Sequence, residues 1–352
     1  MSTDIEKAKT VEEWLDGVDY GSDQFYVPSE FALEFVNFIK LVNGGQGEEN
    51  KTPVLHYRML DQVAGSEARI ANMVHRGAAK TTIMGEYFIL YLAVNGGRLP
   101  NFGRIECAIY LSDSIENGVK SMRKNLQYRW ENSDFLQKYL PEGGGTKFTD
   151  DRWQFCNIEG DFFIVKGFGA KTGIRGFKEM GKRPKLGILD DLVSDEDARS
   201  QTVIASIEAT VHKAMNFALS PSKNKVIWSG TPFNAGDPLY KAVESGAWKV
   251  NVYPVCERFP CSKEEFRGSW EDRFDYNYVK TEYDRAMKQG MVHTFDQELM
   301  LRIMSEEDRL ISDEDIKWYS KSNLWKNRHL FNFYITTDFA TSENEAADYS
   351  VI

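Results

Sequence analysis

The sequence has few cysteines, no long apolar run and no excess of positive charge. Its four cysteines among 352 residues are too few and too scattered for a disulfide scaffold, so a reducing compartment is expected. No stretch approaches the ~18 apolar residues that a membrane-spanning helix needs, and the first ten residues give no sign of a secretory signal. A net charge of −10 argues against nucleic-acid binding through overall charge, but it is compatible with a local basic surface.

What is present is the composition of a folded globular chain, with 42% hydrophobic and 27% charged residues. We expect a helical appendage over residues 1–50 and a core over 51–248, in which apolar strands alternate with helices. Such alternation predicts an α/β fold with a mostly parallel sheet covered by helices on both faces. Residues 249–328 are less regular and predict a lid or linker subdomain. A new apolar strand near residue 331 predicts that 329–352 begin a further module, which is incomplete here.

Residues 75–82 are a candidate phosphate-binding loop. They follow an apolar run and open a helix, and Lys80-Thr81 match the end of the pattern G-x-x-x-x-G-K-[ST], although Val74 and Ala79 stand where that pattern has glycine. A loop entering a helix presents free N–H groups and the positive end of the helix dipole to phosphate. Lys80 would reach the β- and γ-phosphates, and the Thr81 hydroxyl would bind Mg²⁺. The alternative is a surface Lys-Thr pair that begins a helix. The predicted nucleotide-binding residues are Arg76, Gly77, Ala78, Ala79, Lys80, Thr81 and Thr82.

Residues 186–191 predict a buried strand that ends in two acids. Asp190 stands where a metal-binding carboxylate belongs, and Asp191 stands where many ATPases carry the glutamate that polarises the attacking water. Glu196 is a second candidate for that catalytic role. The alternative is an Asp pair that caps the next helix. Because the pair follows Lys80 by about 110 residues within an α/β pattern, metal binding is the favoured interpretation.

Ser229, Gly230 and Thr231 end another predicted strand. Polar groups at the carboxyl end of a parallel strand lie where ligands bind in such sheets. These three residues could sense the γ-phosphate and pass its state to the neighbouring domain, which makes them candidate coupling residues. Taken alone, they would be interpreted as a turn.

Together these segments resemble the large terminase subunit of tailed double-stranded DNA phages, the motor that packages the viral genome. Arg76 stands at the third position of the loop as is typical of that family, and GFGAKTGIRGFKEMGKRPKLGILDDL is similar to its stretch between an I-R-G turn and paired acids. SGTP matches the coupling motif, and FYITTDFATSENEAADYSVI is similar to the first strands of the family's RNase H-like nuclease. The resemblance spans about residue 50 to the end.

The resemblance implies a P-loop ATPase of the ASCE type, followed by a small lid and the first strands of the nuclease. ATP and Mg²⁺ would be the ATPase cofactors, with Thr81 and Asp190 as metal-binding residues. Asp338 would be the first carboxylate of a nuclease site that takes Mg²⁺ or Mn²⁺. Because two-metal hydrolysis needs several acids, we expect this chain to lack nuclease activity.

A transition state for phosphoryl transfer also needs an arginine. Arg76 could supply it in cis, and Arg175 could supply it in trans to the next subunit of a ring. The implied partners are double-stranded DNA, the portal protein and the small terminase subunit, in a homo-oligomeric ring (a pentamer) and with no membrane. The implied location is the host cytoplasm, with transient docking on the procapsid.

Two further groups of residues are weaker candidates. His56, Tyr57 and Gln62, just upstream of the loop, could recognise adenine, although each taken singly is more typical of a helix surface or core. The densest basic stretch could hold DNA phosphates, or it could be a solvated loop. Its members are Lys171, Arg175, Lys178, Lys182, Arg183 and Lys185.

Two other classes of function fit parts of the pattern. A helicase-like remodelling ATPase would need a second ATPase lobe, and residues 250–330 show no α/β pattern. An assembly adaptor with a decayed nucleotide site would fit Ala79 and Asp191, and it would bind nucleotide without hydrolysing it.

Overall fold

The computed structural model describes residues 8–45, 50–172, 174, 176–303 and 325–330. The chain divides into two compact units, Met1–Met304 and Ser305–Ile352. In the second unit the described residues are 325–330, of which Arg328–Leu330 form a single 3-10 turn. The strand expected from residue 331, and Asp338 with it, lies outside the described residues. The expected boundaries at residues 50, 248 and 328 stay predictions, and everything below concerns the first unit.

An eight-stranded sheet forms the centre of the first unit, in the order β10-β1-β9-β8-β4-β7-β6-β5. The six strands from β10 to β7 run parallel, while β6 runs antiparallel to both of its neighbours, β7 and β5. The α/β fold with a mostly parallel sheet is therefore confirmed, and β6 and β7 form a hairpin. The strands are β1 (Arg69–Val74), β4 (Cys107–Ser112), β5 (Lys147–Phe148), β6 (Arg152–Cys156), β7 (Phe162–Gly169), β8 (Leu186–Asp190), β9 (Lys225–Gly230) and β10 (Lys249–Tyr253), with a separate small pair β2 (Arg98–Leu99) and β3 (Gly103–Arg104).

Both faces of the sheet are apolar because alternate residues of each strand point to opposite sides. In β1, Ile70 and Val74 join the core on one face, and Ala71 and Met73 join the core on the other. This explains the near-continuous apolar runs of the central strands, which are typical of parallel sheets buried on both sides.

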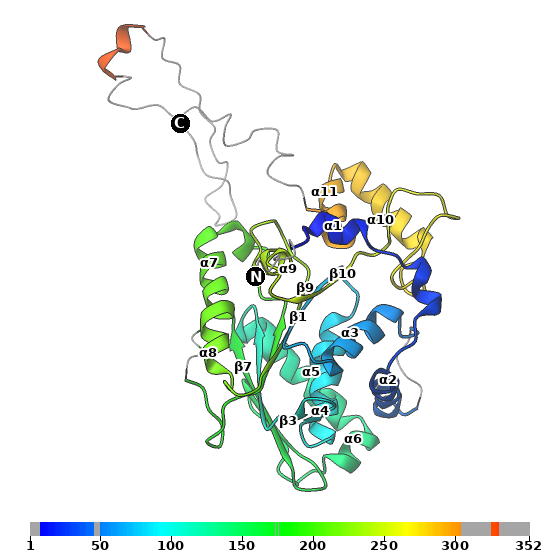
Figure 1. Ribbon diagram of the computed structural model, residues 1–352, viewed down its shortest axis with the longest axis vertical. Coiled ribbons are helices and arrows are strands. Elements are labelled where there is room, and N and C mark those ends of the chain that lie inside the picture. The colour runs from blue at the N-terminus through cyan, green and yellow to red at the C-terminus, as the bar shows by residue number, and fades with distance from the viewer. Residues whose placement is uncertain (1–7, 46–49, 173, 175, 304–324, 331–352) are drawn as a thin grey trace, which may run out of the picture. The chain divides into compact units, whose positions relative to one another are not determined.

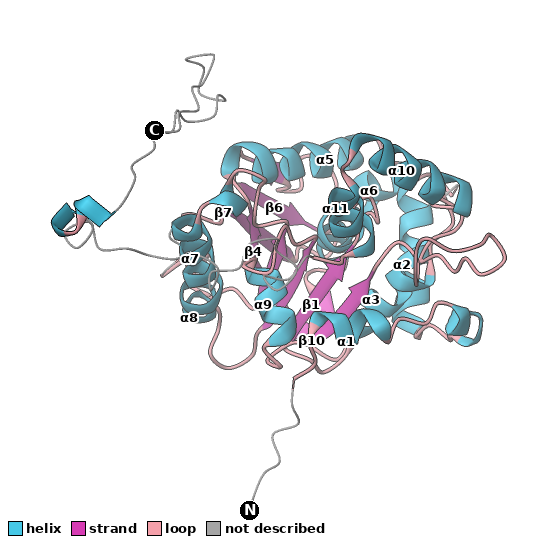
Figure 2. Ribbon diagram, turned by 90° about the horizontal axis from the view of Figure 1, so that it is seen from above, coloured by secondary structure: helices cyan, strands magenta, loops and turns pink. Residues whose placement is uncertain are grey.

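Helices cover the two faces in separate groups, as Figures 1 and 2 show, with α7 and α8 on the side opposite α2–α6. The first face is covered by α2 (Glu30–Val42), α3 (Val54–Ala64), a π-helical segment Thr81–Tyr87 that continues as α4 (Phe88–Val94), Ile115–Val119 continuing as α5 (Lys120–Glu131), and α6 (Asp134–Tyr139). The second face is covered by α1 (Val11–Asp16), α7 (Gln201–Ala209), Thr210–Met215, α8 (Asn216–Ala218) and α9 (Pro238–Glu244).

The segment after β10 has a small core of its own. It contains α10 (Tyr276–Gln289), α11 (Val292–Phe295) and the π-helical segment Asp296–Met300, and Ala79 of the loop after β1 packs against it. Shorter 3-10 segments lie at Gly21–Phe25 and Asp197–Arg199. Among the described residues, no helix is both long and apolar enough to cross a membrane.

Candidate nucleotide site

The loop after β1 follows a tight path that needs two left-handed residues. Gly77 has φ +84°, and a Cβ there would come within 3.1 Å of the Phe274 ring. Ala79 has φ +58°, so the position at which the standard pattern has glycine does adopt a backbone that favours glycine. An alanine in this region costs about 1–2 kcal/mol, and such strain is typical of ligand-binding loops.

Two buried histidines donate hydrogen bonds to backbone carbonyls of this loop. His56 Nε2 donates to the Ala78 carbonyl at 2.7 Å, and His75 Nδ1 donates to the Arg76 carbonyl at 2.9 Å. Burial lowers the pKa of His56 to about 4 and that of His75 to about 3. Both imidazoles are therefore neutral at pH 7 and act as fixed hydrogen-bonding groups.

Lys80 lies at the centre of the site. Its Nζ is 3.1 Å from a carboxylate oxygen of Asp191 and donates to Thr231 Oγ1 at 3.2 Å. Thr231 Oγ1 itself donates to the Val74 carbonyl at 2.6 Å. Asp191, directly after β8, has φ +42°, a strained backbone that places its carboxylate beside the lysine. The tips of β1, β8 and β9 are thus joined through one ammonium group.

Asp190 forms a second group of contacts with the start of the helix. Thr81 Oγ1 donates to Asp190 Oδ1 at 2.9 Å, and the Tyr110 hydroxyl from β4 donates to Asp190 Oδ2 at 2.8 Å. Burial, with the charge of Asp191 beside it, raises the pKa of Asp190. The raised pKa means that too little positive charge surrounds the Asp190 carboxylate to stabilise its ionised form. The Thr81 hydroxyl lies beside this carboxylate. Hard oxygen donors of these two kinds suit Mg²⁺.

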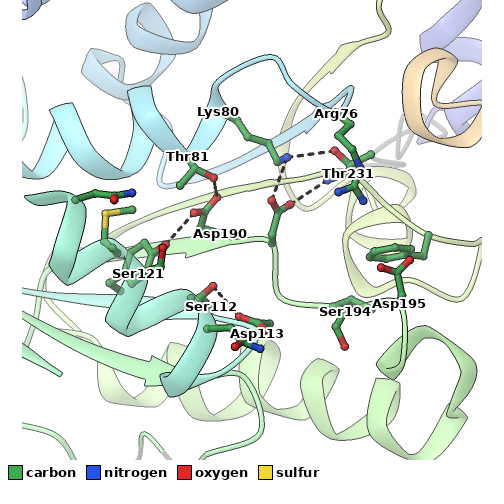
Figure 3. Close-up of a pocket in the computed structure, with 18 residues that line it drawn as sticks. Arg76, Lys80, Thr81, Ser112, Asp113, Ser121, Asp190, Ser194, Asp195 and Thr231 are labelled. Carbon is green, nitrogen blue, oxygen red and sulfur yellow. Dashed lines mark hydrogen bonds and ion pairs between the residues drawn. The ribbon is translucent and has the colours of Figure 1, made fainter. Parts of the chain in front are cut away.

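A cavity of about 350 Å³ opens over these groups. Figure 3 shows Lys80, Thr81, Asp190 and Thr231 facing one another at its wall. Of the other predicted residues, Arg76 and Asp191 line the cavity, whereas Glu196 does not and its neighbour Asp195 does. Ser229 is buried behind the wall. Arg175 lies outside the described residues.

Arg76 does not reach into the cavity freely, because an acid from the segment after α11 holds it. Its guanidinium forms an ion pair with Glu298 and donates a second hydrogen bond to Glu298 Oε1 at 3.0 Å. The backbone N–H of Arg76 also donates to the Glu298 carbonyl at 2.9 Å. The arginine side chain remains more than half exposed, so this pair is of the weak, solvent-screened kind.

The candidate adenine residues separate in space. His56 does not line the first cavity but a second one of about 270 Å³, together with Thr82 and Trp270. Gln62 instead lines a different cavity and bonds to Asn251 of β10. Tyr57 is half-buried against the core of the first face. The structure brings only His56 of the three next to the loop.

The basic stretch between β7 and β8 is largely paired with acids of its own chain. Lys182 and Lys185 both bond to Glu106, and Lys171 bonds to Asp197. These pairs reduce the positive charge that the stretch offers to a phosphate backbone.

Several site residues were missed by the sequence reasoning. Tyr110, Asp113 and Asp195 line the cavity, and Glu298 binds Arg76 from a distant part of the chain. A signal existed for Asp113, because it directly follows a predicted apolar strand. Nothing in the sequence pointed to Glu298.

Comparison with known proteins gives a likeness in structure. No protein-family model matches the chain, and no curated protein matches it. A search of solved structures matches the crystal structure of the HK97 bacteriophage large terminase, with 17% sequence identity and a TM-score of 0.48. The match covers 78% of this chain and 57% of that one, so the chain spans little more than half the length of the solved terminase it is similar to.

Proposed function

We propose that this chain is a Mg²⁺-dependent ATPase that drives double-stranded viral DNA into a preformed capsid. The observation that carries the proposal is the convergence of Lys80, Thr81, Asp190, Asp191 and Thr231 on one cavity. These side chains come from the ends of β8 and β9 and from one helix start, and together they provide a cation for phosphate, oxygen donors for a metal and a second acid, Asp191.

The ion pair between Lys80 and Asp191 gives the site two states. When a triphosphate occupies the loop, Lys80 would turn from Asp191 to the β- and γ-phosphates, which carry more charge. Asp191 would then lose its partner and become available to take a proton from the attacking water. We prefer Asp191 to Glu196 as the catalytic base because Asp191 lines the cavity and Glu196 does not.

Thr81 and Asp190 would hold the magnesium ion, which neutralises charge that develops on the phosphates. In mononucleotide sites Mg²⁺ is bound by one or two protein groups together with phosphates and water, so a third protein ligand is not needed. Tyr110 keeps the Asp190 carboxylate oriented through its hydrogen bond. Arg76 in cis and Arg175 in trans stay the proposed sources of the transition-state arginine.

The remaining parts of the proposal follow from the family resemblance. They are a homo-oligomeric ring, double-stranded DNA, the portal protein and small terminase subunit as partners, docking on a procapsid in the host cytoplasm, and a nuclease that begins near residue 329 with Asp338 as its first metal-binding carboxylate. Because three of the six residues of the basic stretch pair with acids of the chain, binding to DNA should need either Lys178, which has no acidic partner among the described residues, or surfaces that several subunits share.

The test is ATP turnover of the purified chain with Mg²⁺ and DNA, compared between wild type and Lys80→Ala. We expect the substitution to lower turnover at least about 100-fold, since it removes the cation that meets the transferred phosphate. Lys213→Ala, an exposed lysine beyond α7, is the matched control and should leave turnover unchanged. Equal turnover in wild type and Lys80→Ala would remove the assignment.

A second candidate is an adaptor that binds nucleotide without hydrolysing it. The ion pair between Lys80 and Asp191 favours the adaptor, because each of the two groups already has a partner of opposite charge. Tight ATP binding by wild type, with no turnover even in an assembled ring, would select the adaptor.

A further inference from the structure

A row of polar side chains crosses the sheet at one level. Asn251 of β10 pairs in register with Asn72 of β1, Asn72 pairs with Ser229 of β9, and Ser229 pairs with Asp190 of β8. Their exposed fractions are 8%, 0%, 1% and 5%, so the whole row is buried. One end of the row is the acid of the candidate metal site.

The row is hydrogen-bonded from its outer end towards the site. Asn251 and Gln62 of α3 exchange two bonds, at 2.6 and 2.8 Å. Asn251 Nδ2 also donates to Asn72 Oδ1 at 2.7 Å, and Asn72 Nδ2 donates to Ser229 Oγ at 3.2 Å. Each amide is thereby held by its neighbour, and the last one holds Ser229.

Stability alone does not account for these polar residues. Several positions two residues away on the same face are apolar and belong to the core, namely Ile70 and Val74 on either side of Asn72, Ile227 before Ser229 and Ile188 before Asp190. A buried hydrogen-bonded network is costly when any member is lost, and replacing both partners of a pair with apolar groups of the same shape is often neutral. An all-apolar row would therefore fold as well, and the polar one calls for a functional reason.

Ser229 lies beside the catalytic edge of the sheet, by which we mean the ends of β8 and β9 that carry Asp191 and Thr231. Its carbonyl accepts the backbone N–H of Asp191 at 3.1 Å, and two residues later Thr231 contacts both Lys80 and the Val74 carbonyl. Two side-chain hydrogen bonds therefore join β1 to β9. The bond from Asn72 to Ser229 lies inside the sheet, and the bond from Thr231 to Val74 lies at its carboxyl edge. A shift of β9 along β1 would move Thr231 and the backbone that supports Asp191 together.

We propose that Asn72 is a positioning residue for the catalytic edge. It fixes the end of β9 against the strand that carries the phosphate loop, and Asn251 with Gln62 hold its amide in place. This inference rests on the proposed function for its effect on turnover, while its structural half, the placement of the β9 tip, stands independently.

The experiment uses Asn72→Leu, which keeps the side-chain size and removes both hydrogen bonds. We expect backbone hydrogen exchange of segments 189–193 and 229–233, without nucleotide, to become at least about tenfold faster. We expect the Kd for MgATP to stay within about threefold of wild type and kcat to fall at least about tenfold. Adding Ser229→Ala to Asn72→Leu should lower kcat no further than Ser229→Ala alone.

The matched control is Asn157→Leu. Asn157 is also a buried, hydrogen-bonded asparagine, but it lies in the turn between β6 and β7. The Asn157→Leu substitution should lower the Tm without changing kcat or the hydrogen exchange of segments 189–193 and 229–233. This result would separate positioning from a general loss of stability.

The outcomes separate the two proposals. Unchanged exchange at both segments in Asn72→Leu overturns the positioning role, and so does a wild-type kcat in a variant whose Tm alone has changed. If exchange rises but wild type and Lys80→Ala hydrolyse no ATP, the positioning stands and the proposed function fails.

Discussion

The two buried histidines that bond to backbone carbonyls of the candidate phosphate-binding loop should make the protein sensitive to acid. Burial lowers the pKa of His56 to about 4 and that of His75 to about 3, from an ordinary value of 6.5. Below pH 6.5 the unfolded chain therefore binds protons that the folded chain does not. The stabilising contribution of each neutral imidazole is complete above pH 6.5 and is lost as the pH falls from 6.5 towards the folded pKa.

The size of this effect follows from proton linkage. Each histidine that is protonated only in the unfolded chain costs about 1.4 kcal/mol of unfolding free energy per pH unit. At pH 5.5 the loss relative to pH 7.5 is about 1.4 kcal/mol for each histidine, or about 2.8 kcal/mol for both. A domain with about 5–15 kcal/mol of total stability would be weakened measurably.

His56→Gln isolates one of the two contributions. The glutamine amide can still donate to the Ala78 carbonyl, but it takes up no proton. Urea unfolding at pH 7.5 and pH 5.5 should show that the variant loses about 1.4 kcal/mol less than wild type between the two values. His212→Gln, at an exposed position, should lose as much as wild type.

Other titrating groups do not disturb this comparison. Burial raises the pKa of Asp237 to about 6, which acts in the opposite direction, but this carboxyl is present in both proteins and cancels in the difference. If His56→Gln lost as much stability as wild type, the buried neutral imidazole would not be the cause of acid sensitivity, and the reasoning would fail.

Three further predictions concern the site and the core. Tyr110→Phe removes a donor to Asp190 and should weaken MgATP binding about tenfold in a titration, since a hydrogen bond to a charged group contributes about 1.5–3 kcal/mol. Glu298→Ala frees Arg76 and should tighten MgATP binding up to about fivefold, because an exposed ion pair that opens on binding costs up to about 1 kcal/mol. Phe35→Ala in α2 should lower the free energy of unfolding by about 3–5 kcal/mol, because its ring is fully buried among core aromatic residues.

Each of these predictions has a matched control, and two of the three controls lie at exposed positions. Tyr128→Phe and Leu33→Ala should have little effect on MgATP affinity and on unfolding, respectively. Glu282→Ala removes a comparable acid from α10 without touching Arg76. Unchanged affinity in Tyr110→Phe, weaker affinity in Glu298→Ala, or a cost below about 1 kcal/mol for Phe35→Ala would each contradict the corresponding argument.

The central strands and their helices could be predicted because their signals are local. The apolar runs that became β1, β4, β8 and β9 end in polar residues, and glycines mark several of the turns. The turn between β6 and β7 contains Gly160, whose φ of +80° is of the kind that glycine adopts without strain. The candidate role of Lys80 could be predicted because the loop motif is contiguous in the chain. Backbone geometry and burial of this kind depend on near neighbours in sequence.

The contacts across the sheet could not be predicted in the same way. Strand order puts β10 beside β1 and β9 between β1 and β8, and no local pattern encodes that order or its register. The row through Asn72 exists only because four strands from separate parts of the chain align to the residue. The same holds for Glu298, which meets Arg76 across 222 positions.

The sequence by itself therefore determined an α/β chain with a candidate phosphate-binding loop at Lys80 and paired acids at a strand end, because periodicity and contiguous motifs are local features of the chain. Only the tertiary structure decided that Asp191 pairs with Lys80, that Tyr110 supports Asp190, and that Glu298 holds Arg76. Those choices depend on side-chain packing between distant segments, where small differences in register and backbone angle select one partner over its neighbour.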